Sequence, residues 1–204
     1  MTNILIIDSA ATGPASVSKR LTAQFAEVPG ARVVRRDVGA DPIPHLTEET
    51  VAAIRGAEPD NAAALEALAL SDMLIDELRE ADLIVVGAPM YNFGMASTLK
   101  AWFDHVLRAR VTFRYTENGP EGLIKGKRAI VVESRAGLYS EGPSTGMDSQ
   151  EPHIRTLLGF MGITEVTFVR AERLAFGADA ATASIAAASE ALHNLVRDEL
   201  PIAA

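Results

Sequence analysis

The segment 9–18 (SAATGPASVS) carries residue types that can bind a phosphate group without a positive charge. Ser16 stands where a helix is predicted to begin, and Ser is a preferred residue at that capping position. The free backbone N–H groups of a helix start attract anions, and the neighbouring hydroxyls can add donors. Because no Lys or Arg precedes Lys19 in this segment, it suits a phosphate monoester held by neutral donors. The alternative is a capped helix start that binds nothing.

Two further segments have the composition of a site for a flat heteroaromatic ring. Residues 89–94 (PMYNFG) offer an apolar and aromatic wall with one amide, which is what such a ring needs. Residues 134–139 (SRAGLY) are rich in small side chains, so their backbone N–H groups can approach the edge of a ligand. The alternatives are a turn whose aromatic rings only cover the end of a sheet, and a plain surface loop.

Short apolar runs predict the strands that position these segments. Residues 4–7, 83–86 and 129–132 are unbroken apolar runs, as is typical of strands buried on both faces by helices. Residues 166–169 (VTFV) are mixed, and residues 32–38 (RVVRRDV) are polar enough to form an edge strand. The sequence therefore predicts five strands, of which the second is the weakest.

Helical periods fill the gaps between the predicted strands. Apolar residues recur at helical spacing over residues 17–28, 67–78, 99–107 and 185–196, the last ended by Pro201, and residues 150–160 fit a further helix. This alternation predicts a doubly wound α/β domain with a five-stranded parallel sheet in the order 2-1-3-4-5 and helices on both faces. Ligands bind beyond the carboxyl ends of such strands, so the three segments are expected to meet there.

Composition excludes several classes of protein. The 204 residues suggest one domain over residues 1–204, because domains run to about 150 residues. A net charge of −8 argues against nucleic acid or an anionic membrane surface as a partner. The chain has no cysteine, which excludes disulfides and thiolate metal sites. Without a signal-peptide pattern at the start or an apolar run of about 18 residues, we expect a cytoplasmic protein.

Other motifs for ligand binding or catalysis are absent. No G-x-G-x-x-G follows the first predicted strand, so the dinucleotide fingerprint is missing. Residues 122–128 (GLIKGKR) lack the spacing and the final Ser or Thr of a P-loop. There is no G-x-S-x-G, and the four histidines are scattered without metal-ligand spacing. We therefore expect no metal.

A set of motifs in a fixed order resembles the FMN-dependent NADH-azoreductases, which are flavodoxin-like NAD(P)H:quinone oxidoreductases. It consists of PMYNF at 89–93, LKAWFD at 99–104, VTFRYTENGP at 111–120, GL at 122–123, SRAG at 134–137 and LGFMGI at 158–163. The likeness covers nearly the whole chain from Ser16 onward, and the segment 111–120 is its most specific part. The resemblance implies a flavodoxin-like fold, one bound FMN per subunit and a homodimer with active sites at the subunit interface.

The resemblance also implies which residues hold the cofactor. The phosphate would be held by Ser16, Val17 and Ser18, with Ser9 as the nearest hydroxyl to the family's first serine, which falls at Ala10 in close relatives. Two further groups would bind the ring: Met90, Tyr91, Asn92 and Phe93 flanking it, and Ser134, Arg135, Ala136 and Gly137 at its pyrimidine edge. Val17 replaces the family's usual Gln, and Ala136 replaces a usual Gly. A backbone contact survives the first change, and the second is tolerable unless φ is positive.

The implied chemistry is carried by FMN rather than by a catalytic side chain. NADH would give a hydride to the flavin and leave, and a quinone or an aromatic azo compound would then take its place and receive two electrons in a ping-pong scheme. One alternative is a flavodoxin that carries single electrons without substrate turnover. The other is a binding module such as a receiver-type domain, which would place a second acid beside Asp8.

The segment 111–125 is predicted to form a short hairpin inserted before the fourth strand. Apolar and polar residues alternate over 111–115, which suggests one apolar face that its own sheet cannot easily bury. An exposed aromatic patch marks an interface or a ligand groove. Phe113, Tyr115 and Phe160 are the candidates for the acceptor pocket, and core or dimer packing is their alternative role. We expect a C2 homodimer whose pockets are closed by both chains.

Overall fold

The three apolar runs predicted as buried strands form the centre of one parallel sheet. The computed structural model describes residues 1–199, and its strands run in the order β2-β1-β3-β7-β8. Their bounds are Asn3–Asp8 for β1, Arg32–Asp37 for β2, Leu83–Tyr91 for β3, Arg128–Ser134 for β7 and Glu165–Ala171 for β8. All four pairs are parallel, so the predicted order 2-1-3-4-5 is confirmed.

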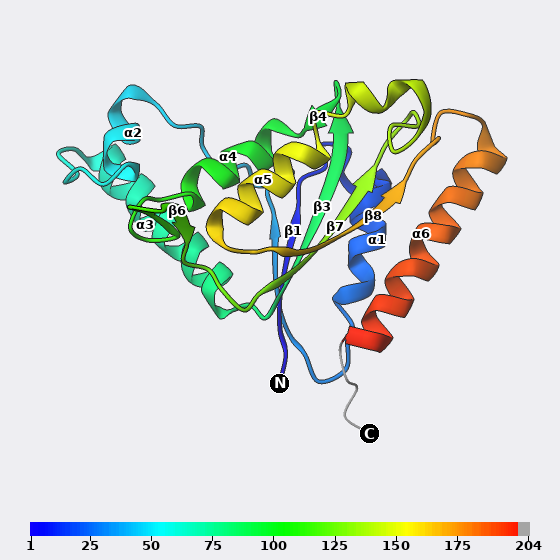
Figure 1. The fold of residues 1–204 in the computed structure, drawn as a ribbon, viewed down its shortest axis with the longest axis horizontal. Helices are drawn as coiled ribbons and strands as arrows, with labels where there is room; N and C mark the ends of the chain where they lie inside the picture. Colours follow the sequence, from blue (N-terminus) through cyan, green and yellow to red (C-terminus); the bar gives the residue numbers. More distant parts are fainter. Residues whose placement is uncertain (200–204) are drawn as a thin grey trace.

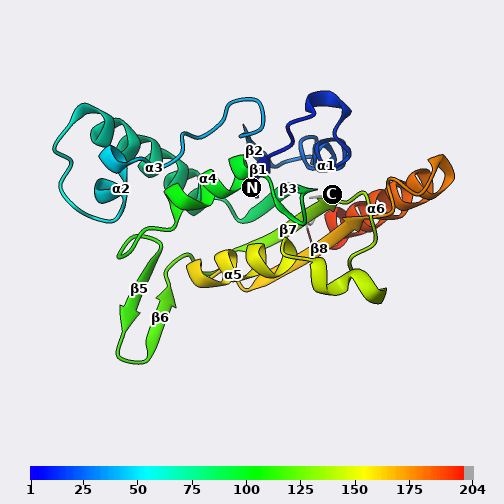
Figure 2. The ribbon, with the colours of Figure 1, turned by 90° about the horizontal axis from the view of Figure 1, so that it is seen from above.

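Helices cover both faces of the sheet, as Figures 1 and 2 show. One face carries α3 (Ala62–Glu80), α4 (Ser97–Val106) and α5 (Glu151–Met161). The other carries α1 (Val17–Thr22) and α6 (Ala178–Glu199). Successive residues of a strand point to opposite faces, so each central strand contributes to both hydrophobic layers.

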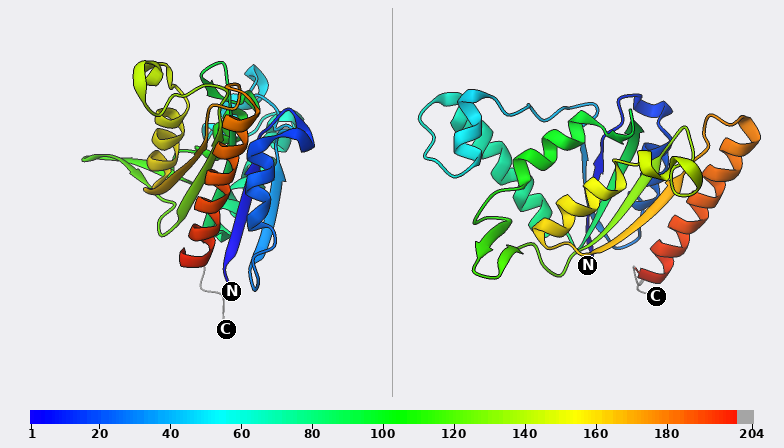
Figure 3. Two further views of the ribbon diagram at one scale, coloured as in Figure 1. Left: turned by 90° about the vertical axis from the view of Figure 1, so that its right-hand side faces the viewer. Right: turned by 45° about the horizontal axis from the view of Figure 1, so that its top comes forward.

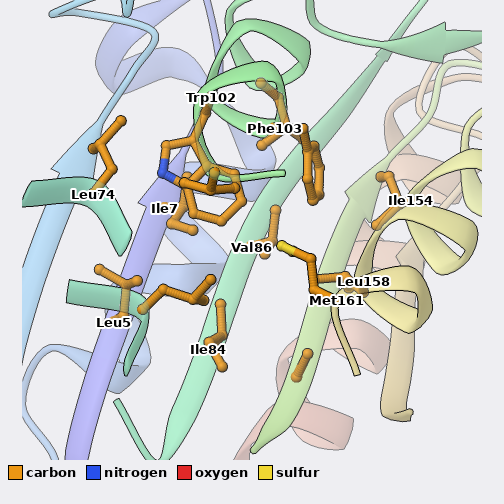
Figure 4. Packing of buried hydrophobic residues seen from close by; sticks show 14 of the residues in the cluster. Leu5, Ile7, Leu74, Ile84, Val86, Trp102, Phe103, Ile154, Leu158 and Met161 are labelled. Carbon is orange, nitrogen blue, oxygen red and sulfur yellow. The ribbon is translucent and has the colours of Figure 1, made fainter. Parts of the chain in front are cut away.

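The larger hydrophobic layer, on the side of α3, α4 and α5, is shown in Figure 4. Trp102 and Phe103 of α4 pack edge to face with their ring centroids 5.0 Å apart and are fully buried. They lie over Ile7 and Val86 of the central strands. This packing fixes α4 behind β3, the strand that carries the aromatic segment 89–94.

Several elements differ in extent from the sequence prediction. The apolar period over 17–28 forms an α-helix only to Thr22, followed by the 3-10 turn Ala23–Phe25, because Pro29 and Gly30 (φ 75°) stop the chain from continuing as a helix. The short α2 (Glu48–Ile54), which begins in a capping box at Thr47, was not predicted. Pro201, the predicted end of the last helix, lies outside the described residues.

Strand β3 extends beyond the predicted 83–86 and includes Met90 and Tyr91. The extension is stabilised by the two-residue strand β4 (Gly94–Met95), which pairs antiparallel with it. What was predicted as one loop over 89–94 is therefore a tight β3–β4 hairpin with Asn92 and Phe93 at its turn. Two further 3-10 segments, Gly13–Ala15 and Gly142–Met147, lie in the loops after β1 and β7.

A second hairpin occupies the segment 111–125. Its strands β5 (Phe113–Thr116) and β6 (Gly119–Gly122) pair antiparallel and project from the body beside α5, as Figures 2 and 3 show. We call β5, β6 and their turn the arm. Its base is packed so closely on the end of α5 that a Cβ on Gly122 would lie 2.1 Å from the backbone nitrogen of Gly162. Within the described chain, no helix has the length and apolarity needed to cross a membrane.

Candidate functional site

The carboxyl ends of β1, β3 and β7 lie side by side at one edge of the sheet, at the top of Figure 1. Asp8 is in register with Gly87, and Pro89 is in register with Ser134. The three segments that follow these strands therefore start from neighbouring positions. We call this region the carboxyl edge.

A hydrogen bond and a ring contact join the three segments to one another. The backbone N–H of Ala11 donates to the hydroxyl of Tyr91 at 3.1 Å, which links the first segment to the second. The N–H of Ser149 donates to the carbonyl of Phe93 at 3.0 Å, and the rings of Phe93 and Tyr139 meet edge to face with centroids 6.1 Å apart. The structure thus brings together the residues predicted to bind the phosphate and the ring.

The first segment carries the neutral donors that the sequence predicts for a phosphate. Ser16 caps α1, with its hydroxyl accepting the N–H of Lys19 at 3.2 Å, and lies 3.1 Å from the hydroxyl of Ser18. Both serines are buried, and Val17 between them is half-buried and contributes its backbone. The Lys19 ammonium forms an ion pair with Asp37, so the nearest basic group already has a carboxylate partner.

Ser9 is placed differently from the other serines of this segment. Its hydroxyl donates to the carbonyl of Gly87 at 2.7 Å, and the residue is only 1% exposed. This bond ties the end of β1 to β3 and leaves only the backbone of Ser9 for a ligand. The neighbouring Asp8 carboxylate is also occupied, by Thr22 at 2.6 Å and by Arg35 at 2.6 Å.

The turn of the β3–β4 hairpin holds two residues in the left-handed region. Asn92 has φ 48° and Phe93 has φ 71°, as a two-residue type I′ turn requires. Asn tolerates this region, but a Phe there is uncommon and strained, and glycine is the favoured residue. The chain nonetheless has Phe93 at this position, with 42% of its surface exposed. Met90 and Tyr91, which precede the turn, are half-buried. An exposed aromatic residue held at positive φ is the kind of outlier found at ligand-binding sites, which agrees with the sequence prediction for Phe93.

The third segment presents small residues at the same edge. Ser134 is the last residue of β7, and Ala136 after it is exposed. Ala136 is not among the residues with positive φ in the described chain, so the change from the family's Gly causes no backbone strain. Gly137 lies against the ring of Tyr139, because a Cβ there would be 2.9 Å from that ring and the Tyr139 side chain would have to shift.

Arg135 behaves unlike its neighbours, because its side chain is completely buried. Its guanidinium lies 2.7 Å from Glu133, 3.0 Å from Asp148 and 3.2 Å from Glu172. Its Nε donates to Gln150 at 3.1 Å. The side chain therefore holds the site together from inside. The backbone of Arg135 is bonded as well, since its N–H donates to the carbonyl of Ala171 at 2.9 Å and its carbonyl accepts the N–H of Leu174 at 3.2 Å.

Glu133 is a buried charged residue beside the site that the sequence reasoning missed. It is fully buried at the end of β7, directly before the third segment. Burial raises the pKa of this carboxyl to about 8, and the charge of Arg135 opposes that shift. The sequence feature that could have identified it is its position: an acidic residue directly follows the apolar run 129–132, where a buried strand ordinarily has another apolar side chain.

The candidate acceptor residues form a cluster of their own at the arm. The ring centroids of Phe113 and Phe160 are 4.6 Å apart, and those of Phe113 and Tyr115 are 5.6 Å apart. Phe113 is 8% exposed, so the predicted apolar face is partly buried in the same chain, because Phe160 at the end of α5 covers it. Only Tyr115 stays open, with 73% of its surface exposed.

This aromatic cluster is not beside the three segments of its own chain. Helix α5 begins at the carboxyl edge with Glu151 and has 11 residues, so Phe160 near its other end is roughly 14 Å farther along the helix axis. A pocket of about 630 Å³ next to the arm is lined by Arg55, Arg110, Arg114 and Tyr115 among others. The structure of one chain therefore separates the cofactor candidates from the acceptor candidates.

The donor set at the carboxyl edge fits FMN. Two hydroxyls and backbone N–H groups at a helix start suit a phosphate, and the exposed and strained Phe93 suits a flat ring. The small residues Ala136 and Gly137 have backbone N–H groups that can reach its edge, whereas the N–H of Arg135 is bonded to Ala171. No acidic side chain competes with the phosphate, since Asp8 and Asp37 already have partners.

Comparison with known proteins agrees with this geometry. The family model described as the flavodoxin-like fold matches residues 2–196. The FMN-dependent NADH:quinone oxidoreductase of Hyphomonas neptunium is 47% identical to this chain and covers 100% of both sequences. The FMN-dependent NADH:quinone oxidoreductase 6 of Burkholderia lata is 51% identical over 94% of this chain and 98% of its own length. An azoreductase structure from Bacillus anthracis superimposes with a TM-score of 0.86 at 27% identity, over 96% of this chain and 99% of that one.

These matches run over essentially the full length of both partners in each comparison. They confirm the family predicted from the ordered motifs and the flavodoxin-like fold expected from strand order. The chain belongs to the flavodoxin-like family of FMN-dependent NADH:quinone oxidoreductases.

Proposed function

We propose that this chain binds FMN at the carboxyl edge and uses NADH to reduce quinones and aromatic azo compounds by two-electron transfer. The observation that carries the proposal is the meeting of three segments there: the serine pair, the strained aromatic turn and the small-residue loop. Relatives 47% and 51% identical to this chain are named FMN-dependent NADH:quinone oxidoreductases. The alternative of a one-electron flavodoxin is not favoured by these names.

Each segment has a distinct task in this proposal. Ser16, Val17 and Ser18 hold the phosphate through two hydroxyls and the backbone. Residues 90–93 flank the ring, and the segment 134–137 lies at its pyrimidine edge. Ala136 and Gly137 are its backbone N–H donors, because the N–H of Arg135 is bonded to Ala171. When bound, FMN supplies the redox chemistry, the transfer of a hydride equivalent from NADH to the acceptor.

The protein contributes position and electrostatics. Fixed N–H donors at the third segment stabilise negative charge that develops on the ring, because they are already oriented before the reaction. The edge-to-face contact of Phe93 with Tyr139 fixes the position of the aromatic ring beside the site. No side chain of the carboxyl edge is required as a nucleophile.

A homodimer is part of the proposal. Within one chain, the aromatic cluster of the arm lies apart from the cofactor segments, and Tyr115 is exposed at its tip. A second copy related by a two-fold axis would bring each arm to the other copy's carboxyl edge, so that both chains line each acceptor pocket. A single domain over 1–204 and a cytoplasmic location stay predictions.

Steady-state kinetics with the flavin-loaded protein test the function. The purified protein should show flavin absorption bands at roughly 370 and 450 nm and should consume NADH when menadione is added. Double-reciprocal plots against NADH at several fixed menadione concentrations should be parallel, because donor and acceptor use one place in turn. Intersecting lines would require both to be bound together, and absence of NADH consumption would favour the electron carrier.

A further inference from the structure

Beneath the ring-binding segments lies a buried cluster of charges centred on Arg135. Its guanidinium is 0% exposed and contacts carboxylates from three different parts of the chain. Glu133 comes from β7, Asp148 from the turn before α5, and Glu172 from the residue after β8. One side chain thus holds three separate segments together.

The cluster is bonded directly to the segments that face the ring. Gln150 accepts a hydrogen bond from the Nε of Arg135 and donates to the carbonyl of Ala88 at 2.9 Å, just before the aromatic segment. Glu172 accepts the backbone N–H groups of Tyr139 at 2.9 Å and Ser140 at 3.1 Å. Through these bonds the guanidinium fixes both the second and the third segments.

The charges of the cluster balance only if one carboxyl is neutral. The guanidinium groups are those of Arg135, Arg155 and Arg170, and the carboxyls are those of Glu133, Asp148, Glu151 and Glu172. The three arginines are thus matched by three carboxylates, which leaves one carboxyl in excess. Glu151 pairs with Arg155 and Arg170, and Asp148 and Glu172 contact Arg135.

Glu133 is the carboxyl best placed to be the neutral one. It is completely buried, and neither of its oxygens has a hydrogen-bond partner in the described chain, although Arg135 lies 2.7 Å away and Arg170 3.6 Å away. Every other carboxyl of the cluster is hydrogen-bonded or partly exposed. Burial raises the pKa of Glu133 to about 8, in agreement with this assignment.

We propose that Arg135 and Glu133 are positioning residues that hold the two ring-binding segments in the arrangement that accepts the flavin, and that this arrangement requires the protonated form of Glu133. The inference rests on the proposed function, because it concerns the affinity of the same site for FMN. Ionisation of Glu133 adds a fourth negative charge to the cluster, against three arginines. The excess charge loosens the cluster and lies one residue from the ring-binding segment 134–137.

The sign of the pH dependence follows from proton linkage. If bound FMN requires the protonated carboxyl, binding takes up a proton wherever free protein has lost it, so affinity falls as pH rises through the pKa. With a pKa of about 8 in the free protein, the dissociation constant should rise about tenfold between pH 7 and pH 9. The phosphate of FMN is fully ionised over this range, since its second pKa is about 6.

Titration of the apoprotein with FMN, followed by flavin fluorescence, tests the inference without enzyme turnover. In Glu133→Gln, whose neutral amide copies the protonated carboxyl, the dissociation constant should stay within about twofold from pH 7 to pH 9 while the unchanged protein shows the tenfold rise. The matched control is Glu190→Gln, an exposed carboxyl on α6, which should keep that rise. Circular dichroism at each pH checks that all three proteins stay folded.

The outcomes separate this inference from the proposed function. A flat profile in the unchanged protein, or a rise that survives Glu133→Gln, overturns the role of Glu133 while FMN binding itself stands. Failure of every protein to bind FMN at any pH overturns the proposed function instead. Arg135→Lys keeps the charge but loses the planar fork, and should weaken FMN binding at least tenfold at pH 7. Undiminished affinity in a folded Arg135→Lys overturns the role of Arg135, and if that variant does not fold, the Glu133→Gln profile decides.

Discussion

At the carboxyl edge the polar groups are bonded to one another within one chain, whereas the arm leaves its outermost ring, Tyr115, 73% exposed. The edge is held by buried contacts between segments far apart in sequence, such as Arg135 with Glu172. The arm is held mainly by local pairing, with the packing of Phe113 on Phe160 as its link to the body. The edge is therefore arranged within one chain, whereas the exposed ring of the arm fits the proposed contact with a second copy.

The two regions share one feature, a bulky residue held at positive φ. Phe93 at the edge has φ 71°, and Arg110 at the base of the arm has φ 69°. The backbone N–H of Arg110 donates to the carbonyl of Phe113 at 2.6 Å, so the strained residue helps to fix where the arm begins. Both positions would be less strained with glycine. Because a larger side chain is present despite this strain, we infer that the side chains of Phe93 and Arg110 each have a specific role.

The largest effect is expected at the phosphate segment of the edge. Ser16→Ala combined with Ser18→Ala removes two hydroxyl donors to a charged group, each contributing about 1.5–3 kcal/mol. The FMN dissociation constant should rise by roughly 10²-fold or more, with the fold intact apart from about 1 kcal/mol lost with the Ser16 cap. Fluorescence titration measures the affinity, and urea unfolding measures the stability.

Thr156→Ala is the matched control for the serine pair. Its hydroxyl donates to the carbonyl of Pro152 on α5, away from the phosphate segment, so FMN affinity should not change. Unchanged affinity in the serine double variant as well would show that this segment does not hold the phosphate.

A smaller effect, and one confined to the acceptor, is expected at the arm. Tyr115→Ala removes an exposed aromatic contact worth about 0.5–1.5 kcal/mol, so kcat/KM for menadione should fall about 2- to 10-fold while FMN affinity stays constant. Leu65→Ala, which changes an exposed apolar residue on α3, should change neither quantity.

The proposed homodimer has a test of its own. Light scattering should give about twice the chain mass of 21.7 kDa. A fully active monomer would contradict the shared pocket.

The contrast between edge and arm also shows what the sequence could predict. Unbroken apolar runs at 4–7, 83–86 and 129–132 identified the central strands, because burial on both faces leaves no room for alternation. The strand order then followed from the alternation with helices, and it placed three loops at one edge. Both hairpins depend on local pairing, and alternation at 111–115 indicated one of them.

Long-range electrostatics could not be predicted in the same way. The partners of Arg135 lie 15 and 37 positions away in Gln150 and Glu172, and no local pattern connects them. Arg135 was expected at the edge of the ring, but its side chain is fully buried and contacts three carboxylates instead. The extension of β3 through Tyr91 was missed because it depends on pairing with β4, a strand of only two residues.

The smallest effect is expected from relieving strain at the two positions of positive φ, and it separates their roles. Arg110→Gly removes about 1–2 kcal/mol of left-handed strain against about 0.5–1 kcal/mol of added chain entropy, so the free energy of unfolding should rise by about 0.5–1 kcal/mol. Phe93→Gly gains the same relief but loses the contact with Tyr139, worth about 0.5–1.5 kcal/mol, so stability should change little. FMN affinity should fall about 2- to 10-fold in Phe93→Gly only, since a single aromatic contact with the ring is lost. Urea unfolding of both apoproteins and FMN titration measure the two quantities. Equal FMN affinity in the two variants would mean that Phe93 does not contact the ring. The positive φ of Phe93 would then have a purely structural role, as that of Arg110 has in fixing where the arm begins.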